Sequence, residues 1–422
     1  MPTTESPGPD HARLAEEFGT PLFVYDAQTA ERSYAALRRA LPEGVDIMYS
    51  LKANPNVSVC ALLGSLGAGA EVSSHAELVT ALRAGIAPED VIFLGPGKSH
   101  QELEACLDAG IAALVCESLD EVERVDALVG QRGSAPFPVM LRVNPSFAAK
   151  GQGLAMGGKP RQFGIDEAVV RDAKHRLGDL AGVRITGIHA YMGTRFLDHT
   201  SVVRNTERIL GLAESLAADL GIDLESVDFG GGLGVAYFAG EGDPDMAALG
   251  RGMHEAIADF RGRNPRCRLM MESGRYLTAA SGTYVVRVRE VKESMGELFA
   301  VADGGTNHHM AAVGVGSFAK RNFPVRRLGP AESSATHEYS VTGPLCTPND
   351  LIAKKVVLPE LRAGDLLGIG RSGAYGPTAS PGLFLSHGYP AEVMVHRGRA
   401  HLVRLPDTTG DLLGRQRLVD LR

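Results

Sequence analysis

The stretch Ile47–Asn54, IMYSLKAN, joins a short apolar run to a lysine and sets the pattern for the first part of the chain. Between about Leu22 and Glu272, similar apolar runs alternate with amphipathic stretches of helical period, several of them followed by the glycine that favours a helix end. Seven or eight such units over about 250 residues predict a (β/α)8 barrel, with a doubly wound sheet as the alternative. The expected strands are Ile47–Leu51, Val91–Leu94, Ala113–Val115, Val139–Val143, Ile185–Tyr191, Ser226–Phe229 and Leu269–Met271.

The sequence changes character after about Ser281, where short alternating runs are separated by Gly/Pro turns. This pattern predicts a second, β-rich domain. Within it, the irregular stretch from His308 to Ser334 is expected to be a functional or mobile loop. We expect a tail and lead-in over residues 1–20, the barrel over 21–278, and the β-domain over 279–422 with a contribution from the N-terminal segment. The expected strands of this domain are Tyr284–Val291, Leu298–Asp303, His337–Thr342, Leu366–Ile369, Ala391–His396 and Ala400–Leu405.

The composition is that of a soluble globular protein, with 44% hydrophobic and 22% charged residues in 422. A net charge of −7 argues against a dedicated nucleic-acid binder. The sequence contains no run of about 18 apolar residues, so it predicts no membrane span. The N-terminus does not resemble a secretory signal. Five cysteines, an odd number without metal-ligand spacing, argue against a disulfide framework or a structural metal and favour the cytoplasm.

Two motifs of the barrel region point to a carbonyl cofactor that carries a phosphate. Lys52 follows an early strand, so it would point into the barrel mouth, where an amine can form a Schiff base. Asp228–Gly234, DFGGGLG, is a glycine turn after a strand, whose bare N–H groups can approach a phosphate. Each motif alone has a simpler explanation, a solvated lysine in the first case and a tight turn in the second.

Glu272 ends another strand, within MESGRY (271–276), and would point into the same mouth. A buried carboxylate needs a partner, and the protonated nitrogen of a pyridine ring is a suitable one. Arg275 could bind a phosphate or carboxylate, or could simply pair with Glu272. In the second domain, Cys346 lies in the turn GPLCTPND (343–350) and Tyr375 in SGAYG (372–376), both ordinary turns when taken alone.

Taken in order, the motifs resemble the fold-type III decarboxylases that depend on pyridoxal 5′-phosphate (PLP), a family that includes the diaminopimelate, ornithine and arginine decarboxylases. The resemblance runs from about Phe18 to Gly376. It implies an alanine-racemase-like (β/α)8 TIM barrel with a β-domain, PLP as cofactor, and a head-to-tail homodimer with shared active sites. The motifs are SLKAN (50–54), EVSSHAEL (71–78), GIHAYMGT (187–194), DFGGGLGV (228–235), ESGRY (272–276), GPLCTPND and GAYG (373–376).

The resemblance also implies a role for each matched residue. Lys52 would hold PLP as a Schiff base, and Glu272 would pair with the pyridine nitrogen. Cys346, contributed across the dimer interface, would protonate the carbanion after CO₂ leaves, a step that Lys52 could also perform. Tyr191 would stack on the ring; His189 is its rival, or else a satisfied core histidine. The remaining matches are Glu71 near the ring, Thr194, Gly231, Gly232, Gly274, Arg275 and Tyr375 at the phosphate, and Asp303 and Asp350 near the substrate; no metal is implied.

Three departures from the family pattern bear on the substrate. Tyr191 stands where the family usually has histidine. Thr347 follows Cys346, where ornithine and diaminopimelate decarboxylases carry an acidic residue that grips the distal ammonium. The segment after Asp303 reads GGTNHHM and lacks the Arg-Pro that helps hold the distal carboxylate of diaminopimelate. A free diamino acid is therefore disfavoured as substrate.

The stretch MGGKPRQFGI (156–165), with His308-His309 and GPLCTPND, is similar to decarboxylases of secondary metabolism, such as those of the butirosin antibiotic pathway. This predicts decarboxylation of an acidic amino acid, of glutamyl or methylaspartyl type, tethered to an acyl carrier protein. Alternatives are a decarboxylase of free diaminopimelate or another free amino acid, an amino-acid racemase of the same fold, and a non-catalytic PLP carrier. A basic landing site for the carrier could come from Lys150, Lys159, Arg161, Lys320, Arg321, Arg326 and Arg327, unless these are ordinary surface charges.

Overall fold

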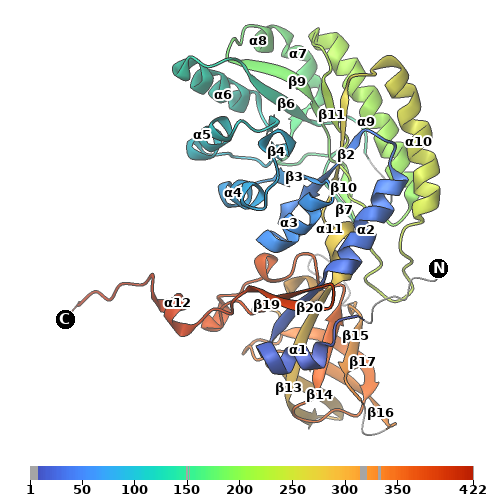
Figure 1. Ribbon diagram of the computed structural model, residues 1–422, viewed down its shortest axis with the longest axis vertical. Coiled ribbons are helices and arrows are strands. Elements are labelled where there is room, and N and C mark those ends of the chain that lie inside the picture. Colours follow the sequence, from blue (N-terminus) through green and yellow to red (C-terminus); the bar gives the residue numbers. More distant parts are fainter. Residues whose placement is uncertain (1–7, 149–150, 152, 314–320, 331–333, 422) are drawn as a thin grey trace. The chain divides into compact units, whose positions relative to one another are not determined.

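The computed structural model describes residues 8–148, 151, 153–313, 321–330 and 334–421, and within them the chain forms two compact units (Figure 1). The barrel unit comprises Glu31–Ala236 and Gly242–Leu277. The β unit comprises the chain up to Ala30, Tyr237–Glu241, and the chain from Thr278 onward. The N-terminal segment that belongs with the β unit therefore reaches Ala30.

Eight parallel strands close the barrel, which confirms the predicted fold class. The strands are short, apolar and buried on both faces, as expected for parallel strands covered by helices. The sequence analysis missed one of them, Gly69–Val72, because the run GAEV is short and contains a charge. In order around the barrel the strands are β2 (Val45–Ser50), β3 (Gly69–Val72), β4 (Val91–Phe93), β5 (Ala113–Cys116), β6 (Phe137–Asn144), β9 (Val183–His189), β11 (Ser226–Asp228) and β12 (Arg268–Ser273).

Capping residues set the ends of several helices between these strands. Ser99 and Glu102 form a reciprocal capping box at the start of α5, and Asp198 accepts two backbone hydrogen bonds at the start of α9. Gly221 ends α9 in the left-handed conformation with φ of 73°. The helices are α2 (Ala27–Ala40), α3 (Val57–Ser65), α4 (His75–Arg83), α5 (His100–Ala109), α6 (Leu119–Arg132), α7 (Glu167–Asp172), α8 (Lys174–Gly178), α9 (His199–Leu220), α10 (Met246–Arg263) and α11 (Arg275–Thr278).

Side chains fill the interior of the barrel, so it is a packed core and not a pore. Met48 of β2, Ile92 of β4, Val115 of β5, Met140 of β6 and Met270 of β12 are all buried in one cluster. Because all eight strands run parallel, their carboxyl ends meet at a single face of the barrel. The chemistry of the unit is therefore expected at that face.

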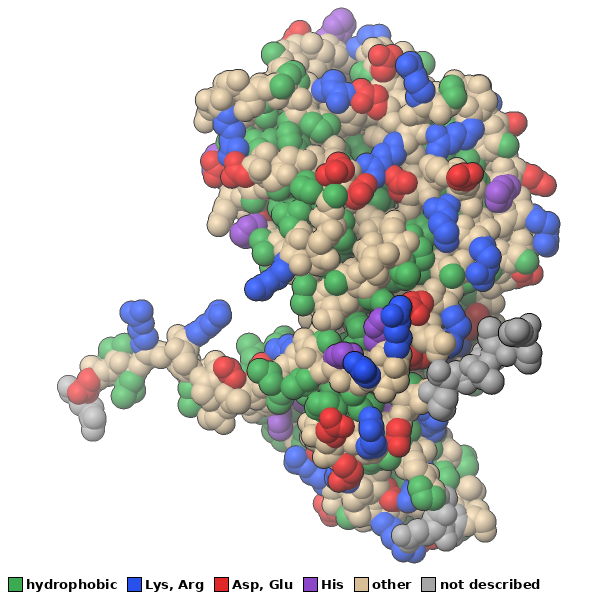
Figure 2. All heavy atoms as spheres, viewed as in Figure 1, with side chains coloured by type: hydrophobic (Ala, Val, Ile, Leu, Met, Phe, Trp, Pro, Cys, Tyr) green, Lys and Arg blue, Asp and Glu red, His purple; other side chains and the backbone are tan. Residues whose placement is uncertain are grey.

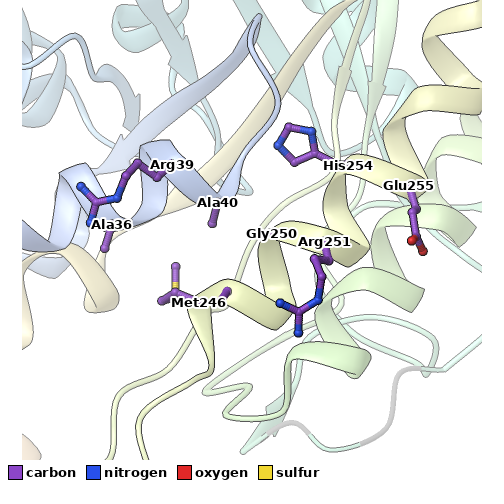
Figure 3. A pocket seen from close by; sticks show the side chains of 9 residues that line it. Ala36, Arg39, Ala40, Met246, Gly250, Arg251, His254 and Glu255 are labelled. Atoms are coloured by element: carbon purple, nitrogen blue, oxygen red, sulfur yellow. The ribbon is translucent and has the colours of Figure 1, made fainter.

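A surface pocket of about 710 Å³ lies on the outside of the barrel between α2 and α10 (Figure 3). The two helices approach closely, since a Cβ on Gly250 would lie 3.3 Å from the Cα of Ala40. Arg39, Arg251 and His254 stand around this pocket. It contains none of the site residues predicted from the sequence.

The β unit is built on a mixed sheet of nine strands. β1 pairs with β13 and with β19, so a strand from the start of the chain lies between two strands from its second half. The order is β17-β16-β14-β13-β1-β19-β20, and β18 joins β13 to β15. The elements are α1 (His11–Phe18), β1 (Leu22–Asp26), β13 (Gly282–Ser294), β14 (Glu297–Ala302), β15 (Val325–Leu328), β16 (Thr336–Thr342), β17 (Leu351–Pro359), β18 (Leu366–Gly370), β19 (Ala391–His396), β20 (Arg399–Arg404) and α12 (Thr409–Leu413).

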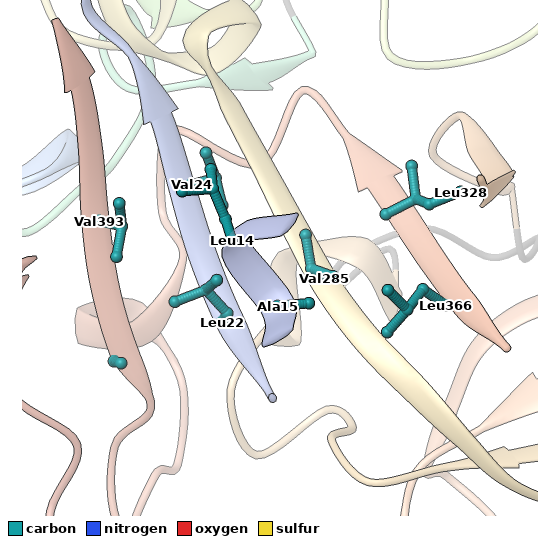
Figure 4. Packing of buried hydrophobic residues seen from close by; sticks show 9 residues of the cluster. Leu14, Ala15, Leu22, Val24, Val285, Leu328, Leu366 and Val393 are labelled. Atoms are coloured by element: carbon teal, nitrogen blue, oxygen red, sulfur yellow. The ribbon is translucent and has the colours of Figure 1, made fainter. Parts of the chain in front are cut away.

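Helix α1 covers the apolar face of this sheet (Figure 4). Leu14 and Ala15 of the helix pack against Leu22 and Val24 of β1 and Val285 of β13, all at most 1% exposed. Burying side chains of this size is worth roughly 1.5–3 kcal/mol each. The cluster therefore fixes α1 and β1 to the β unit.

The stretch from His308 to Ser334, expected to be irregular, is only partly so. His308 and His309 are buried, Met310–Val313 form a short helix, and Val325–Leu328 form β15, paired with β18. The prediction of one long loop was wrong here, because VRRL has no apolar alternation to reveal a strand. Residues 314–320 and 331–333 lie outside the described part of the chain.

Cationic and anionic side chains are interspersed on the face seen in Figure 2. This matches the modest net charge of −7. Over the described residues, none of the helices combines the length and the apolar character needed to cross a bilayer.

Candidate functional site

Lys52 lies directly after β2, in the single 3₁₀ turn Leu51–Ala53. Its Nζ is 3.1 Å from Oε2 of Glu71, at the end of β3, and 4.0 Å from Oε2 of Glu272 in β12. Both carboxylates are buried, whereas 43% of the lysine side chain is exposed. The amine thus stands at the carboxyl face of the barrel with two acidic groups beneath it.

Glu272 makes a short hydrogen bond with a histidine of β9, the second strand along the barrel from β12. His189 Nε2, at the end of β9, lies 2.7 Å from Glu272 Oε1, and both residues are at most 2% exposed. Burial acts to raise the pKa of Glu272, but the hydrogen bond from His189 and the charge of Lys52 outweigh it and lower the pKa. Glu272 is therefore ionised at neutral pH.

Asp228 is a third buried acid of this cluster, and the sequence analysis gave it no role. It ends β11 beside His189, its register partner on β9, and its Oδ1 accepts a hydrogen bond of 2.8 Å from the N–H of Gly230. Complete burial, and then the charge of Glu272, raise its pKa well above the ordinary value. The two acids are thus shifted in opposite directions, Asp228 toward its protonated form and Glu272 toward its ionised form. The available signal was an acid at the end of an apolar strand, the aspartate of DFGGG.

Arg142 is a second residue that the sequence analysis missed, although a charge inside the apolar run VMLRV could have revealed it. It lies two residues before the end of β6, is 7% exposed, and donates a hydrogen bond of 2.6 Å to Glu117. Its charge also contributes to the lowered pKa of Glu272.

The glycine turn after β11 packs where no side chain could fit. A Cβ on Gly231 would lie 1.8 Å from the carbonyl oxygen of Glu272, and one on Gly232 would lie 2.0 Å from that of Gly193. Gly232 also has φ of +84°, which disfavours other residues. Gly274 similarly approaches Ser50 and Ala53, with a Cβ contact of 2.8 Å to Ala53. These turns bring bare backbone to the same face of the barrel as Lys52.

The other predicted residues of the barrel unit lie around this face. Lys52 Nζ is 5.5 Å from the ring centroid of Tyr191, which is half-buried, whereas His189 is buried against Glu272. Thr194 belongs to β10 (Gly193–Thr194), which pairs with β7 (Leu154–Ala155). Arg275 begins α11, directly after Gly274.

The predicted residues of the β unit gather around the turn that follows β16. Cys346 is exposed and Thr347 is half-buried. Asp350 is 2% exposed, and its two oxygens each accept a backbone hydrogen bond of 2.8 Å, from Thr306 and from Leu345. The carboxylate of Asp350 therefore stabilises this turn through both of its oxygens.

Asp303 and Tyr375 also belong to the β unit. Asp303 accepts hydrogen bonds from the Thr20 hydroxyl at 2.5 Å and from the N–H of Arg287 at 2.9 Å. Tyr375 is half-buried in a turn with φ of +55°.

Of the seven basic residues considered for a landing site, Lys150 and Lys320 lie outside the described residues. Lys159 and Arg161 are exposed on the barrel unit, and Arg326 on the β unit. Arg321 pairs with Glu241 at 3.0 Å and Arg327 with Asp365 at 2.6 Å. The last two charges are thus already neutralised within the β unit.

These residues fit PLP. Glu272 Oε2 accepts no hydrogen bond from the described residues, and an ionised buried oxygen of this kind suits a protonated pyridine nitrogen. The amine of Lys52 stands beside it and could bind the carbonyl carbon of the cofactor, and the turns at Gly231 and Gly274 are bare backbone of the kind that can approach a phosphate. His189, Asp228 and Glu272 also place ligand atoms within 4.8 Å of one another, a spacing that a metal ion could use. The hydrogen bond between His189 and Glu272 already occupies two of these groups.

Comparisons with known proteins agree with this geometry. Residues 27–279 match the family described as "Pyridoxal-dependent decarboxylase, pyridoxal binding domain". The chain is 35% identical to the L-glutamyl-[BtrI acyl-carrier protein] decarboxylase of Niallia circulans, over 96% of this chain and 95% of that one. It is 32% identical to the diaminopimelate decarboxylase of Neisseria meningitidis serogroup B, over 94% and 93% of the two chains.

A solved structure shows the same fold. The crystal structure of diaminopimelate decarboxylase from Helicobacter pylori, complexed with L-lysine, superimposes with a TM-score of 0.86 at 28% identity, over 96% of this chain and 98% of that one. With the family match covering more than half of the chain, the protein belongs to the PLP-dependent decarboxylases of the ornithine, arginine and diaminopimelate decarboxylase family.

Proposed function

We propose that this enzyme removes the α-carboxylate of an acidic amino acid, of glutamyl or methylaspartyl type, that is tethered as a thioester to an acyl carrier protein. The observation that carries the proposal is the sequence Cys346-Thr347-Pro348, where an acidic residue would grip a distal ammonium. A tethered substrate has no free distal charge, so a threonine suffices. The resemblance to the glutamyl-carrier-protein decarboxylase of Niallia circulans points the same way.

The hydrogen bonds of two acids in the β unit support a substrate whose distal end carries no charge. Both oxygens of Asp350 accept backbone hydrogen bonds, and Asp303 accepts from Thr20 and Arg287. An acid that is already satisfied in this way gains little from a further ammonium and would have to give up a bond to bind it. Neither carboxylate is therefore well placed to select a diamino acid.

When bound, PLP accepts the electron pair that the departing carboxylate leaves on Cα. Glu272, ionised and oriented by His189, would keep a proton on the pyridine nitrogen. Asp228, whose pKa burial raises, would be held toward its uncharged form and so compete little with Glu272. Glu71 would hold the Lys52 amine near the cofactor carbonyl, and the ring of Tyr191 would support one face of the cofactor.

Thr194, Gly231, Gly232, Gly274, Arg275 and Tyr375 remain our proposed phosphate contacts. We propose that the enzyme is a homodimer in which the exposed Cys346 of one subunit serves the site of the other and returns a proton to Cα. We place the reaction in a secondary-metabolite pathway of the cytoplasm.

The test is a substrate panel that compares glutamyl and methylaspartyl thioesters on a carrier protein with free glutamate, free diaminopimelate and free ornithine. CO₂ release from a tethered substrate, at a kcat/KM well above that of every free amino acid, is the expected result. Turnover of free diaminopimelate without turnover of any thioester would refute the proposal. Racemised substrate without CO₂ would assign the enzyme to the racemases of this fold.

A further inference from the structure

A groove of about 770 Å³ lies in the β unit, along the sheet and up to the turn that carries Cys346. Its floor is made by outward-facing side chains of neighbouring strands. Phe299 of β14 lies between its register partners Lys292 of β13 and Ser340 of β16. One step further along, Val301 is the partner of Thr342, which in turn is the partner of Leu351 of β17.

The opposite face of the same strands is turned to the core. Ala300, Ala302 and Val341 are fully buried, whereas Phe299 and Val301, which alternate with the two alanines, are only half-buried. Side chains alternate between the two faces of a strand, so the groove side is the outer face of the sheet. An apolar strip on that face, framed by polar groups, is suited to a ligand.

The groove leads to the proposed substrate position. From Glu297 to Val301 it follows β14 over about 13 Å, at roughly 3.3 Å per residue. It continues to Leu345, Thr347 and Pro348, on either side of Cys346 in the sequence. A ligand lying along it would deliver its end to the turn at Cys346.

Two lysines give the groove a preference for an anion. Lys292 lines one side and Lys354, on β17, lines the other; neither makes an ion pair with any carboxylate of the described residues. Among the acids of the lining, Glu297 is neutralised by Lys355 at 3.1 Å, and Asp350 is turned to backbone N–H groups. Among the charged residues of the lining, this leaves the negative charge of Glu293 and the positive charges of the two unpaired lysines.

We infer that this groove holds the phosphopantetheine arm of the carrier protein, an inference that rests on the proposed function. The arm is slender and combines apolar carbons with amides, which match Phe299 and Val301 on the one hand and Ser340 and Thr342 on the other. Its phosphate meets Lys292 and Lys354 as a charge-assisted contact. Thr347 lies at the end of the groove, where the thioester arrives.

The test compares the double variant Lys292→Glu/Lys354→Glu with the control Lys174→Glu, which changes an exposed lysine of the barrel unit that does not line the groove. Each holoenzyme is assayed with a glutamyl carrier-protein thioester and with the glutamyl thioester of N-acetylcysteamine, which has no phosphate. We expect the double variant to raise KM for the carrier thioester about tenfold, equivalent to about 1.4 kcal/mol from two exposed charge pairs, at unchanged kcat. The truncated thioester and the control variant should show unchanged KM.

Unchanged KM of the double variant for the carrier thioester overturns the groove and leaves the proposed function intact. An equal rise for both thioesters also overturns it, since the phosphate would then have no part. A shift in oligomeric state at unchanged KM would assign the groove to a contact between subunits. If the wild-type enzyme turns over neither thioester, the proposed function is refuted. In that case, calorimetric binding of 4′-phosphopantetheine to the wild type but not to the double variant still supports the groove as its binding site. If the wild type does not bind it either, the proposed function and the proposed groove are both refuted.

Discussion

His189 Nε2 lies 2.7 Å from Glu272 Oε1 in a site where both side chains are buried. The histidine thereby lowers the pKa of the carboxyl and fixes its direction. We interpret His189 as a positioning residue for Glu272, and we propose that Tyr191 stacks on the face of the cofactor ring.

Replacing His189 should therefore act through Glu272. His189→Leu removes the hydrogen bond, so the pKa of Glu272 rises and the acid limb of the kcat profile moves to higher pH. A bond to a charged group is worth about 1.5–3 kcal/mol, so kcat should fall roughly tenfold to a hundredfold at neutral pH. Measurement of kcat against pH, with the cofactor band followed by absorbance, checks this.

His189→Gln, which can still donate to Glu272, should recover part of kcat, and the exposed His175→Leu serves as control. A His189→Leu enzyme with wild-type kcat and an unshifted acid limb would show that the bond does not matter for catalysis.

Asp228→Asn should leave the fold intact, because burial raises the pKa of the native carboxyl and favours its uncharged form, and an amide oxygen can still accept from Gly230. A carboxyl whose folded pKa is raised stabilises below its unfolded pKa of about 4 and loses that contribution as pH rises. The melting temperature of Asp228→Asn relative to wild type should accordingly increase from pH 5 to pH 8. Calorimetry at several pH values measures it.

The exposed Asp259→Asn is the matched control and should show no such trend. A stability difference for Asp228→Asn that shrinks with rising pH would mean that Asp228 is ionised in the folded enzyme.

Gly231→Ala should impair both stability and cofactor binding, since the new Cβ would meet the backbone of Glu272. We expect the dissociation constant of PLP to rise at least about tenfold, equivalent to about 1.4 kcal/mol. Gly211→Ala, in the middle of α9 with nothing within 4 Å of its Cβ, should instead stabilise by roughly 0.5–1 kcal/mol. PLP titration together with thermal unfolding separates the two; equal PLP affinity in both variants would contradict the proposed cradle.

Cys346 should be the thiol that reacts rapidly with a disulfide reagent. It is exposed, whereas burial raises the pKa of Cys60, Cys106 and Cys267 to about 12 and that of Cys116 further. We expect one fast thiol per chain in the native enzyme, and none in Cys346→Ala. Several fast thiols in Cys346→Ala would contradict the buried positions of the other four.

The sequence predicted the barrel because its strands are continuous apolar runs, but it could not reveal pairing at a distance. The sequence placed the chain from residue 21 onward in the barrel, and only the hydrogen bonds of Leu22–Asp26 to β13 and β19 assign that strand to the β unit. β17 was missed because Lys354 and Lys355 interrupt its apolar pattern at a bulge, where Lys355 has φ of +52°.

The site was predicted residue by residue, but its electrostatics were not. Lys52 and Glu272 could be placed at strand ends from the sequence. The bond between His189 and Glu272, and the raised pKa of Asp228 beside it, depend on the order of β9, β11 and β12 around the barrel. Spacing along the chain does not carry that information.

The most direct test of the central claim is to reduce the holoenzyme with borohydride and map the pyridoxyl-modified peptide. The account predicts modification of Lys52, held between Glu71 and Glu272, and its loss in Lys52→Ala. Lys98 also follows a barrel strand, but it is 3% exposed and is bound to Glu121 and two carbonyl oxygens. Modification of Lys98, or an unchanged yield of modified peptide in Lys52→Ala, would contradict the account.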